Sequence, residues 1–207
     1  MLKETFLQLL LPYSTAPAAG RQWQLIETYY TEPHRHYHTL AHLQYLLQQL
    51  LPVKRNVENW EALLLALYYH DLVYNTARND NEEQSAELAA HYLQGTQIPK
   101  ESILLCRQHI LATKSHVAHQ SHDTNLFTDA DLSVLGSTPE AYLTYAKQIR
   151  QEYSHTPYAQ YVKGRTTVLQ HFLQLPFIYK TAPFQHLQVR AKENMVNEIT
   201  LLQQAAI

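Results

Sequence analysis

Apolar residues recur three and four positions apart along almost the whole chain, and this spacing limits its fold more than any other feature. Such a period puts apolar side chains on one face of an α-helix, whereas strands show strict alternation, which is scarce here. We therefore expect an all-α, single-domain helical bundle of about eight to ten helices. The expected helices cover residues 2–11, 20–31, 38–51, 57–73, 82–94, 98–113, 123–133, 138–154, 157–174 and 184–204.

Length, charge and cysteine content narrow the class of protein. A chain of 207 residues can form one well-buried core. Its 16 basic and 18 acidic residues form no long block of either sign, so nucleic acid is not an expected partner. Cys106 is the only cysteine and cannot form an internal disulfide, and Glu4 and Gln8 interrupt the apolar N-terminal run, so neither a signal peptide nor a membrane span is expected. These features indicate a reduced, cytoplasmic protein.

Histidine is abundant: the chain has 13 histidines and only 4 glycines. Neutral imidazole is a common metal ligand, so the chain is well supplied with such groups. His38 and His42 are four positions apart in the helix expected from residue 38, and they share a face with Leu46 and Leu50. That face is expected to point into the core.

A second histidine motif stands at the end of the helix expected at 57–73. His70 continues the apolar stripe of Leu63 and Leu67, and Asp71 lies beside it. Two histidines and a carboxylate at one depth can bind a divalent metal, because imidazole and carboxylate suit first-row transition metals. Either motif alone is more typical of a hydrogen-bonded core histidine.

A third motif is the pair Asp129 and Asp131, which interrupts the apolar segment FTDADLSVLG. Burying a lone ionised aspartate costs several kcal/mol unless a counter-charge such as a divalent cation is present. Asp131 is the stronger candidate, because Leu132 and Leu135 flank it at helical spacing. The ordered combination of H-x3-H, HD and D in a helical chain indicates a metal site.

This combination resembles the HD superfamily of metal-dependent phosphohydrolases, whose ligands follow the order H, HD and D on an all-helical fold. The likeness is nearest to a bacterial group of predicted HD phosphohydrolases, and it rests on RHYHTLAHL, HDLVYN, NEEQSAELA, GRTTVLQHFLQLPFIYK and the approximate RAKEN. It spans residues 30 to 204 and implies one HD-type domain over 1–207. The motif core would cover residues 30–135, with the helices of 138–204 packed on it.

A more distant likeness assigns roles. YHTLAH is similar to the YHNxxH element of class I cyclic-nucleotide phosphodiesterases, and ADLS to their metal-binding aspartate segment. The resemblance implies that His38 is a general acid and that the metal ligands are His42, His70, Asp71 and Asp131, with Asp71 also counted among the catalytic residues. This chain has LVYN where those enzymes continue with proline and glycine, which argues against cyclic-nucleotide hydrolysis.

The four ligands would leave open positions on an octahedral metal, one of Mn, Mg, Fe, Co or Ni, for a water and a phosphoryl oxygen. The expected function is a metal-dependent phosphohydrolase in which a metal-activated water attacks a phosphomonoester or a nucleotide-type substrate. The expected partner is therefore a small phosphorylated molecule, with a nucleotide as one candidate because tyrosines cluster around the HD pair. A homodimer is an open alternative for the apolar residues of helix 184–204.

Other polar residues could take part in catalysis or substrate binding, but each of them could instead have a purely structural role. Glu83, or its neighbour Glu82, could act as a base, although acids also favour the start of a helix. Four further residues could bind the substrate or instead serve as loop and interhelical contacts: Lys114, His116, Arg150 and Arg165.

Two other functions stay open at this point. The first is a diiron oxygenase on the same scaffold, which would need additional ligands such as His109, His116 or Glu83. The second is a non-catalytic module that binds or senses a ligand and retains a metal.

Overall fold

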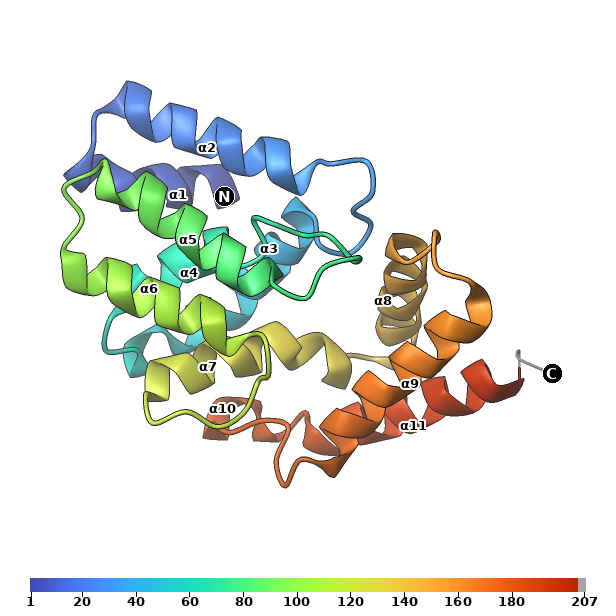
Figure 1. The fold of residues 1–207 in the computed structure, drawn as a ribbon. Helices are drawn as coiled ribbons and strands as arrows, with labels where there is room; N and C mark the ends of the chain where they lie inside the picture. The colour runs from blue at the N-terminus through green and yellow to red at the C-terminus, as the bar shows by residue number, and fades with distance from the viewer. Residues whose placement is uncertain (205–207) are drawn as a thin grey trace. The chain divides into compact units, whose positions relative to one another are not determined.

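The structure is a computed structural model that describes residues 1–204, and helices make up nearly all of its regular structure (Figure 1). No strand occurs within the described residues, so the all-α prediction is confirmed. The α-helices are α1 (Leu2–Leu10), α2 (Ala16–Tyr30), α3 (Leu40–Leu50), α4 (Trp60–Tyr69), α5 (Asn81–Gln94), α6 (Lys100–Ala112), α7 (His122–Asp131), α8 (Pro139–Glu152), α9 (Tyr158–Gln174), α10 (Ala182–Gln185) and α11 (Gln188–Gln204). Three short 3-10 segments join them: η1 (Leu11–Tyr13), η2 (Leu51–Asn56) and η3 (Leu132–Gly136).

Two helix boundaries differ from the sequence prediction in an informative way. The helix expected at 184–204 is two helices, α10 and α11. The helix expected from residue 38 begins at Leu40, because Thr39 is extended and its hydroxyl accepts a hydrogen bond from the backbone N–H of Ala41. A threonine in that position caps the N-terminus of a helix, so the helix begins at the next residue. His38 therefore lies before α3 and not within it.

The chain divides into two compact units, unit 1 from Met1 to Thr128 and unit 2 from Asp129 onward. Helix α7 runs through the boundary. The prediction of a single HD-type domain over 1–207, with the helices of 138–204 packed on the motif core, stays a prediction. Its last three residues, 205–207, lie outside the described part of the chain.

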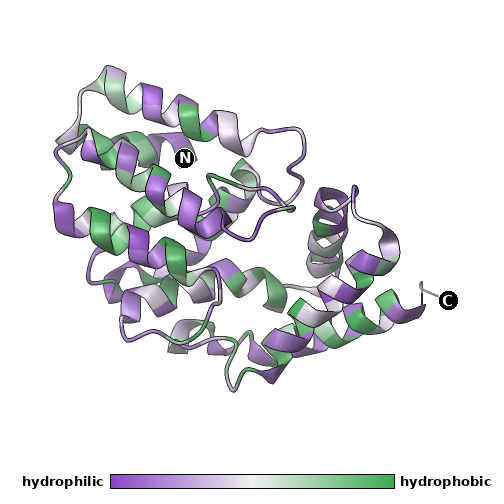
Figure 2. Ribbon diagram, in the orientation of Figure 1, coloured by the Kyte–Doolittle hydropathy of each residue, from purple (hydrophilic) through white to green (hydrophobic). Residues whose placement is uncertain are grey.

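Helix α4 forms the centre of unit 1. Every residue from Ala62 to Tyr69 is buried, so the helix is covered on all sides. It packs against α6, α5, α3 and α1. By contrast, hydrophilic and hydrophobic residues alternate along the outer helices α2 and α5 (Figure 2), as expected when one face meets solvent. A central apolar helix of this kind holds its C-terminal end, where the HD pair stands, in a fixed position.

Unit 2 is held by α11, which packs against α9, α8 and η3. At Gly136 an added Cβ would lie only 2.6 Å from the Cβ of Leu187, so a side chain at this position would force the two segments apart. Between α9 and α11, the buried Arg165 and Glu198 form an ion pair with Nε to Oε1 at 2.8 Å and Nη2 to Oε2 at 3.0 Å. The hydroxyl of Tyr142 donates to the same carboxylate at 2.6 Å. Unit 2 thus contains a buried polar network of its own.

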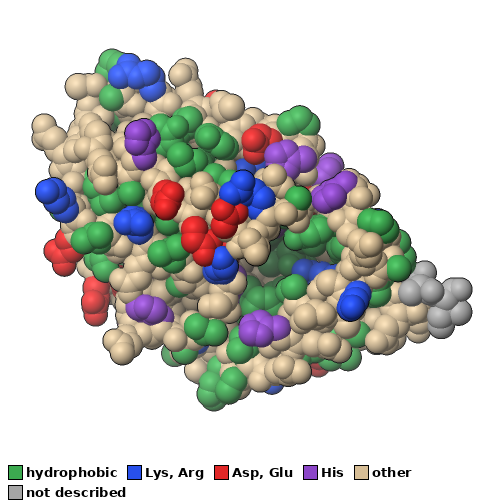
Figure 3. All heavy atoms as spheres, in the orientation of Figure 1, with side chains coloured by type: hydrophobic (Ala, Val, Ile, Leu, Met, Phe, Trp, Pro, Cys, Tyr) green, Lys and Arg blue, Asp and Glu red, His purple; other side chains and the backbone are tan. Residues whose placement is uncertain are grey.

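Cys106 is buried in α6, and this burial raises the pKa of its thiol. Among residues 1–204, no helix has both the length and the hydropathy to cross a membrane. On the face shown in Figure 3, basic and acidic side chains are mixed rather than gathered by sign.

Candidate metal centre

His70 directly follows the last residue of α4, and its backbone N–H still donates to the carbonyl of Ala66 at 2.9 Å. The imidazole is buried, and its Nδ1 lies 3.0 Å from the carbonyl oxygen of Leu67. A carbonyl oxygen can only accept, so Nδ1 carries the proton in this contact. The other nitrogen, Nε2, then presents a lone pair, which is the arrangement of a histidine that ligates a metal.

His42, in the first turn of α3, points its Nε2 at the same place. This atom lies 3.2 Å from Nε2 of His70 and 3.8 Å from Oδ2 of Asp71, and Oδ2 is 2.9 Å from Nε2 of His70. With the proton of His70 on Nδ1, Nε2 of His70 and Oδ2 of Asp71 are both acceptors when the imidazole is neutral and the carboxyl is ionised. At 2.9 Å these two atoms can face one another only with a proton or a metal ion between them. Nε2 of His42 accepts or donates according to its tautomer.

Asp71 is the anionic member of this group. Burial by itself favours the protonated carboxyl, but the neighbouring imidazoles of His70, His38 and His42 outweigh burial, and the pKa of Asp71 lies below its usual range. The carboxyl is therefore ionised at neutral pH. It offers a negative charge to a cation at the end of α4.

His38 reaches the group from the segment before α3. Its Nε2 is 4.0 Å from Oδ2 of Asp71, and its ring lies 5.7 Å from the ring of His42. The ring of Tyr74 stacks on it at 4.1 Å with an interplanar angle of 30°. The sequence prediction that His38 and His42 lie together is confirmed by these contacts, but the reason given for it, a shared helix face, is wrong.

Asp131, the fourth ligand expected from the sequence, is the half-buried last residue of α7 and belongs to unit 2, whereas His42 and His70 belong to unit 1. Its role as a ligand stays a prediction. Imidazole and carboxylate donors suit several divalent metals and do not select one of them.

Asp129, the other aspartate of the motif that was considered as a metal ligand, has a structural role. It is fully buried, and its carboxylate accepts hydrogen bonds from the backbone N–H groups of Lys180 and Thr181 and from the hydroxyl of Thr181. The ammonium group of Lys180 lies 3.0 Å from it. Asp129 thus ties the segment before α10 to the start of unit 2, which supports the preference for Asp131 as a ligand.

The two acids at the start of α5 differ in their surroundings. Glu83 forms an ion pair with Lys114, whose ammonium group also donates to the carbonyl of Asn79 at 2.7 Å. Glu82 is half-buried; burial is the main reason that its pKa is raised, and the charge of Asp71 adds to the effect. Of the two acids, Glu82 is therefore the one whose pKa is raised in part by the charge of Asp71. The ion pair of Glu83 with Lys114 connects the start of α5 to the end of α6.

The remaining predicted substrate ligands have structural contacts. His116 adopts a left-handed backbone conformation, with φ of 53°, in the loop after α6. Arg150 donates to the carbonyls of Tyr153 and Thr156 beyond the end of α8. Arg165 forms an ion pair with Glu198. Substrate binding by Lys114, His116, Arg150 or Arg165 stays a prediction.

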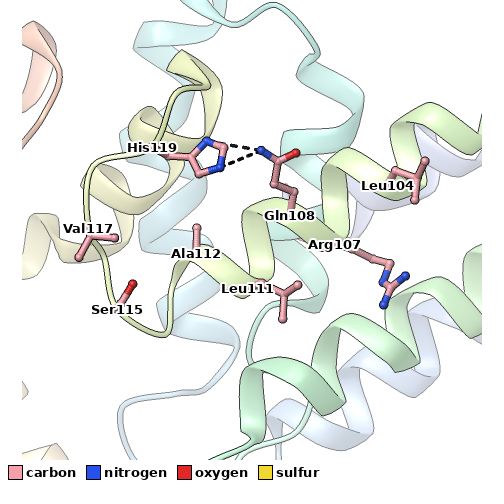
Figure 4. A pocket seen from close by; sticks show the side chains of 8 residues that line it. All are labelled: Leu104, Arg107, Gln108, Leu111, Ala112, Ser115, Val117 and His119. Carbon is pink, nitrogen blue, oxygen red and sulfur yellow. Dashed lines mark hydrogen bonds between the residues drawn. The ribbon is translucent and has the colours of Figure 1, made fainter.

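A separate groove lies along α6 and the loop that follows it (Figure 4). The ring of His119 faces the side-chain amide of Gln108 across it, with Nε2 at 3.0 Å. Exposed Leu104 and Leu111 provide its apolar wall. None of the residues that line it belongs to the histidine and aspartate group.

His109 is buried in α6 and supplies a test of the packing of unit 1. Its Nδ1 lies 2.9 Å from the hydroxyl of Thr124, and its ring packs near Phe127. Burial lowers the pKa of His109 from 6.5 to about 4. Below pH 6.5 the unfolded chain therefore gains a proton that the folded chain does not take up until about pH 4.

We expect this histidine to destabilise the protein as the pH falls through that window, by up to about 3 kcal/mol. The variant His109→Asn can keep the contact with Thr124 without the titration, so its free energy of unfolding should fall less between pH 7 and pH 4.5. Urea unfolding at both pH values measures the difference, with His91→Asn on the exposed face of α5 as the control. An equal fall in both variants and in the parent protein would contradict the prediction.

No protein-family model matches the chain, and no curated protein or solved structure matches it either. The resemblance to the HD superfamily accordingly stays a prediction based on the motifs.

Proposed function

We propose that the protein is a metal-dependent phosphohydrolase that acts on a phosphomonoester or a nucleotide-type substrate through a metal-activated water. One observation carries the proposal: Nε2 of His42, Nε2 of His70 and Oδ2 of Asp71 face one another within 3.8 Å. The adjacent histidine and aspartate thus present their donors to one point, together with a histidine from another helix. This is a donor set that first-row divalent metals accept.

Helix geometry supports Asp131 as the fourth ligand. The ring of Phe127 on α7 meets the ring of His70 edge-on, with centroids 5.7 Å apart. Residues four apart share a helix face, so Asp131 belongs to the same face of α7 as Phe127, one turn further along.

A bound divalent metal would lower the pKa of a coordinated water and polarise a phosphoryl oxygen. The protein's own residues would then position the substrate and move protons. His38 lies at the edge of the group with its side chain 19% exposed, so it can reach both Asp71 and a leaving oxygen. We assign it the role of general acid. Glu82 rather than Glu83 is the acid that could orient the water, because Glu83 is held by Lys114.

The experiment is to remove metal with a chelator, restore Mn²⁺, and measure phosphate release from phosphomonoesters and from nucleoside mono-, di- and triphosphates. We expect release that depends on the metal. In His38→Ala it should fall by roughly 10²- to 10⁴-fold, the usual contribution of a general acid, with unchanged metal content. The exposed His91→Ala is the matched control.

The possible results separate the proposal from its rivals. Metal binding without phosphate release from any substrate would favour a non-catalytic metal-containing module. Two irons per chain with oxygen consumption would instead favour the diiron oxygenase. One of the additional ligands that function would need, Glu83, is already paired with Lys114.

A further inference from the structure

Arg35 is the first residue of the RHYHTLAHL motif. The sequence pattern assigns roles to the histidines of this motif but none to Arg35. It lies in the segment between α2 and α3, and its side chain is fully buried. Burying a guanidinium group is costly unless its donors are satisfied. The partners of this buried charge should therefore show what it does.

Four hydrogen bonds connect Arg35 to two separate segments. Its Nη1 donates to the carbonyl of Asp71 at 2.7 Å, and its Nη2 donates to the carbonyl of Leu72 at 2.9 Å. The same Nη1 lies 3.3 Å from the carbonyl of His38. On the other edge, Nε donates to the carboxylate of Glu32 at 2.9 Å. The guanidinium thus bonds to the backbone of the predicted acid, His38, and to that of the HD pair.

Two tyrosines strengthen the same connection. The guanidinium carbon lies over the ring of Tyr30 at 5.0 Å and over the ring of Tyr74 at 5.4 Å. The hydroxyl of Tyr30 accepts a hydrogen bond from the backbone N–H of Asp71 at 3.2 Å, and Tyr74 stacks on His38. Both rings that contact Arg35 therefore also contact a member of the histidine and aspartate group.

We infer that Arg35 is the positioning residue of the candidate metal centre: it fixes the segment of His38 against the end of α4 that carries His70 and Asp71. The inference rests on the proposed metal-dependent function. Arg35 contacts the backbone of these residues and not the face where the donors meet, so it acts through them. It sets the distance between the acid and the ligands.

Lysine could not do the same. The guanidinium is a planar fork with five N–H donors, and it reaches the carbonyls of Asp71, Leu72 and His38 at once. An ammonium group is a point charge with three donors for the four acceptors that Arg35 meets, so at least one of them, a carbonyl oxygen or the Glu32 carboxylate, would lose its partner. The loss of such a supporting contact typically weakens metal affinity by roughly 10- to 100-fold.

The test compares the Mn²⁺ dissociation constants of the full-length protein and of the variants Arg35→Met and Arg35→Lys, by competition with a fluorescent chelator. We expect affinity to fall by about 10- to 100-fold in Arg35→Met and by a smaller factor in Arg35→Lys. A third variant, Glu32→Gln, keeps the arginine and removes only its ionic partner, so it provides a measurement if the first two fold poorly. It should weaken binding less than either. Arg78→Met, in an exposed ion pair with Asp80, is the control and should not change the constant.

The outcomes distinguish the inference from the proposed function on which it rests. If the unmodified protein binds no Mn²⁺ or other divalent metal, the metal-dependent function fails. If it binds the metal and the folded Arg35 variants bind it equally well, the positioning role is overturned. A lower melting temperature of the metal-free variants with an unchanged dissociation constant would also overturn it, because that pattern belongs to a residue that only stabilises the fold.

Discussion

Replacing His70 with asparagine should abolish metal binding while leaving the fold intact. The amide nitrogen of asparagine can occupy the place of Nδ1 and donate to the carbonyl of Leu67, which the histidine approaches to 3.0 Å. What the change removes is Nε2, the atom that faces His42 at 3.2 Å and Asp71 at 2.9 Å. The variant therefore separates the chemistry of the ligand from the packing of α4.

The expected effect is large. Loss of a ligand should weaken metal affinity by more than about 100-fold, the upper end of what changes to supporting residues cost. At a metal concentration of 100 times the dissociation constant, the parent protein should gain about 2.7 kcal/mol of stability from the metal, and His70→Asn should gain almost none. Thermal unfolding with and without Mn²⁺ measures this gain.

His109→Asn is a suitable control for a buried histidine, because His109 contacts Thr124 and Phe127 and not the facing nitrogens. It should retain the gain from metal. If His70→Asn retains it as well, His70 is a structural histidine and the proposed centre is wrong. If the parent protein itself gains nothing from Mn²⁺ or another divalent metal, a proton rather than a metal lies between Nε2 of His70 and Oδ2 of Asp71.

The sequence predicted the helices well, because their apolar period reflects a local property of the chain. It also predicted that His70 points inward, since His70 extends the stripe of Leu63 and Leu67 and each of these residues is buried. Where a helix is covered on all sides, as α4 is, its last inward residue has a fixed direction. Periodicity is sufficient in such a case.

The position of His38 needed more than periodicity. The prediction of a helix from residue 38 did not take account of Thr39, whose hydroxyl caps the N-terminus of α3. His38 therefore lies before the helix. A threonine before an apolar run is a recognisable cap, so this signal was present in the sequence. His38 nevertheless approaches Asp71, because Tyr74 stacks on its ring and Arg35 bonds to its carbonyl. These are tertiary contacts, and no local sequence pattern predicts them.

The roles of charged residues were the hardest to predict. Glu82 and Glu83 are adjacent, and only the position of Lys114 decides which of them is paired. Arg165 could equally have met an acid or a substrate anion, and its partner Glu198 lies 33 positions away. Partner choice between distant charges is set by the packing of helices, and a single sequence does not contain that information.

Arg165→Met should destabilise the protein by about 3–5 kcal/mol, because it leaves the carboxylate of Glu198 buried without its counter-charge. For a chain of this size each kcal/mol lowers the melting temperature by roughly 2–4 °C, so a fall on the order of 10 °C is expected. Urea unfolding and thermal melting measure both quantities. Lys163→Met on the exposed face of α9 is the matched control and should change little.

The double variant Arg165→Met/Glu198→Gln tests the physical reason. Glutamine removes the uncompensated charge and can still accept the hydrogen bond from Tyr142, so most of the lost stability should return. If Arg165 instead binds a substrate anion, the single variant would unfold with nearly the parent free energy and would raise the KM of phosphate release. Because both Nε and Nη2 of Arg165 are bonded to one buried carboxylate, we expect the loss to appear in stability and the double variant to reverse it.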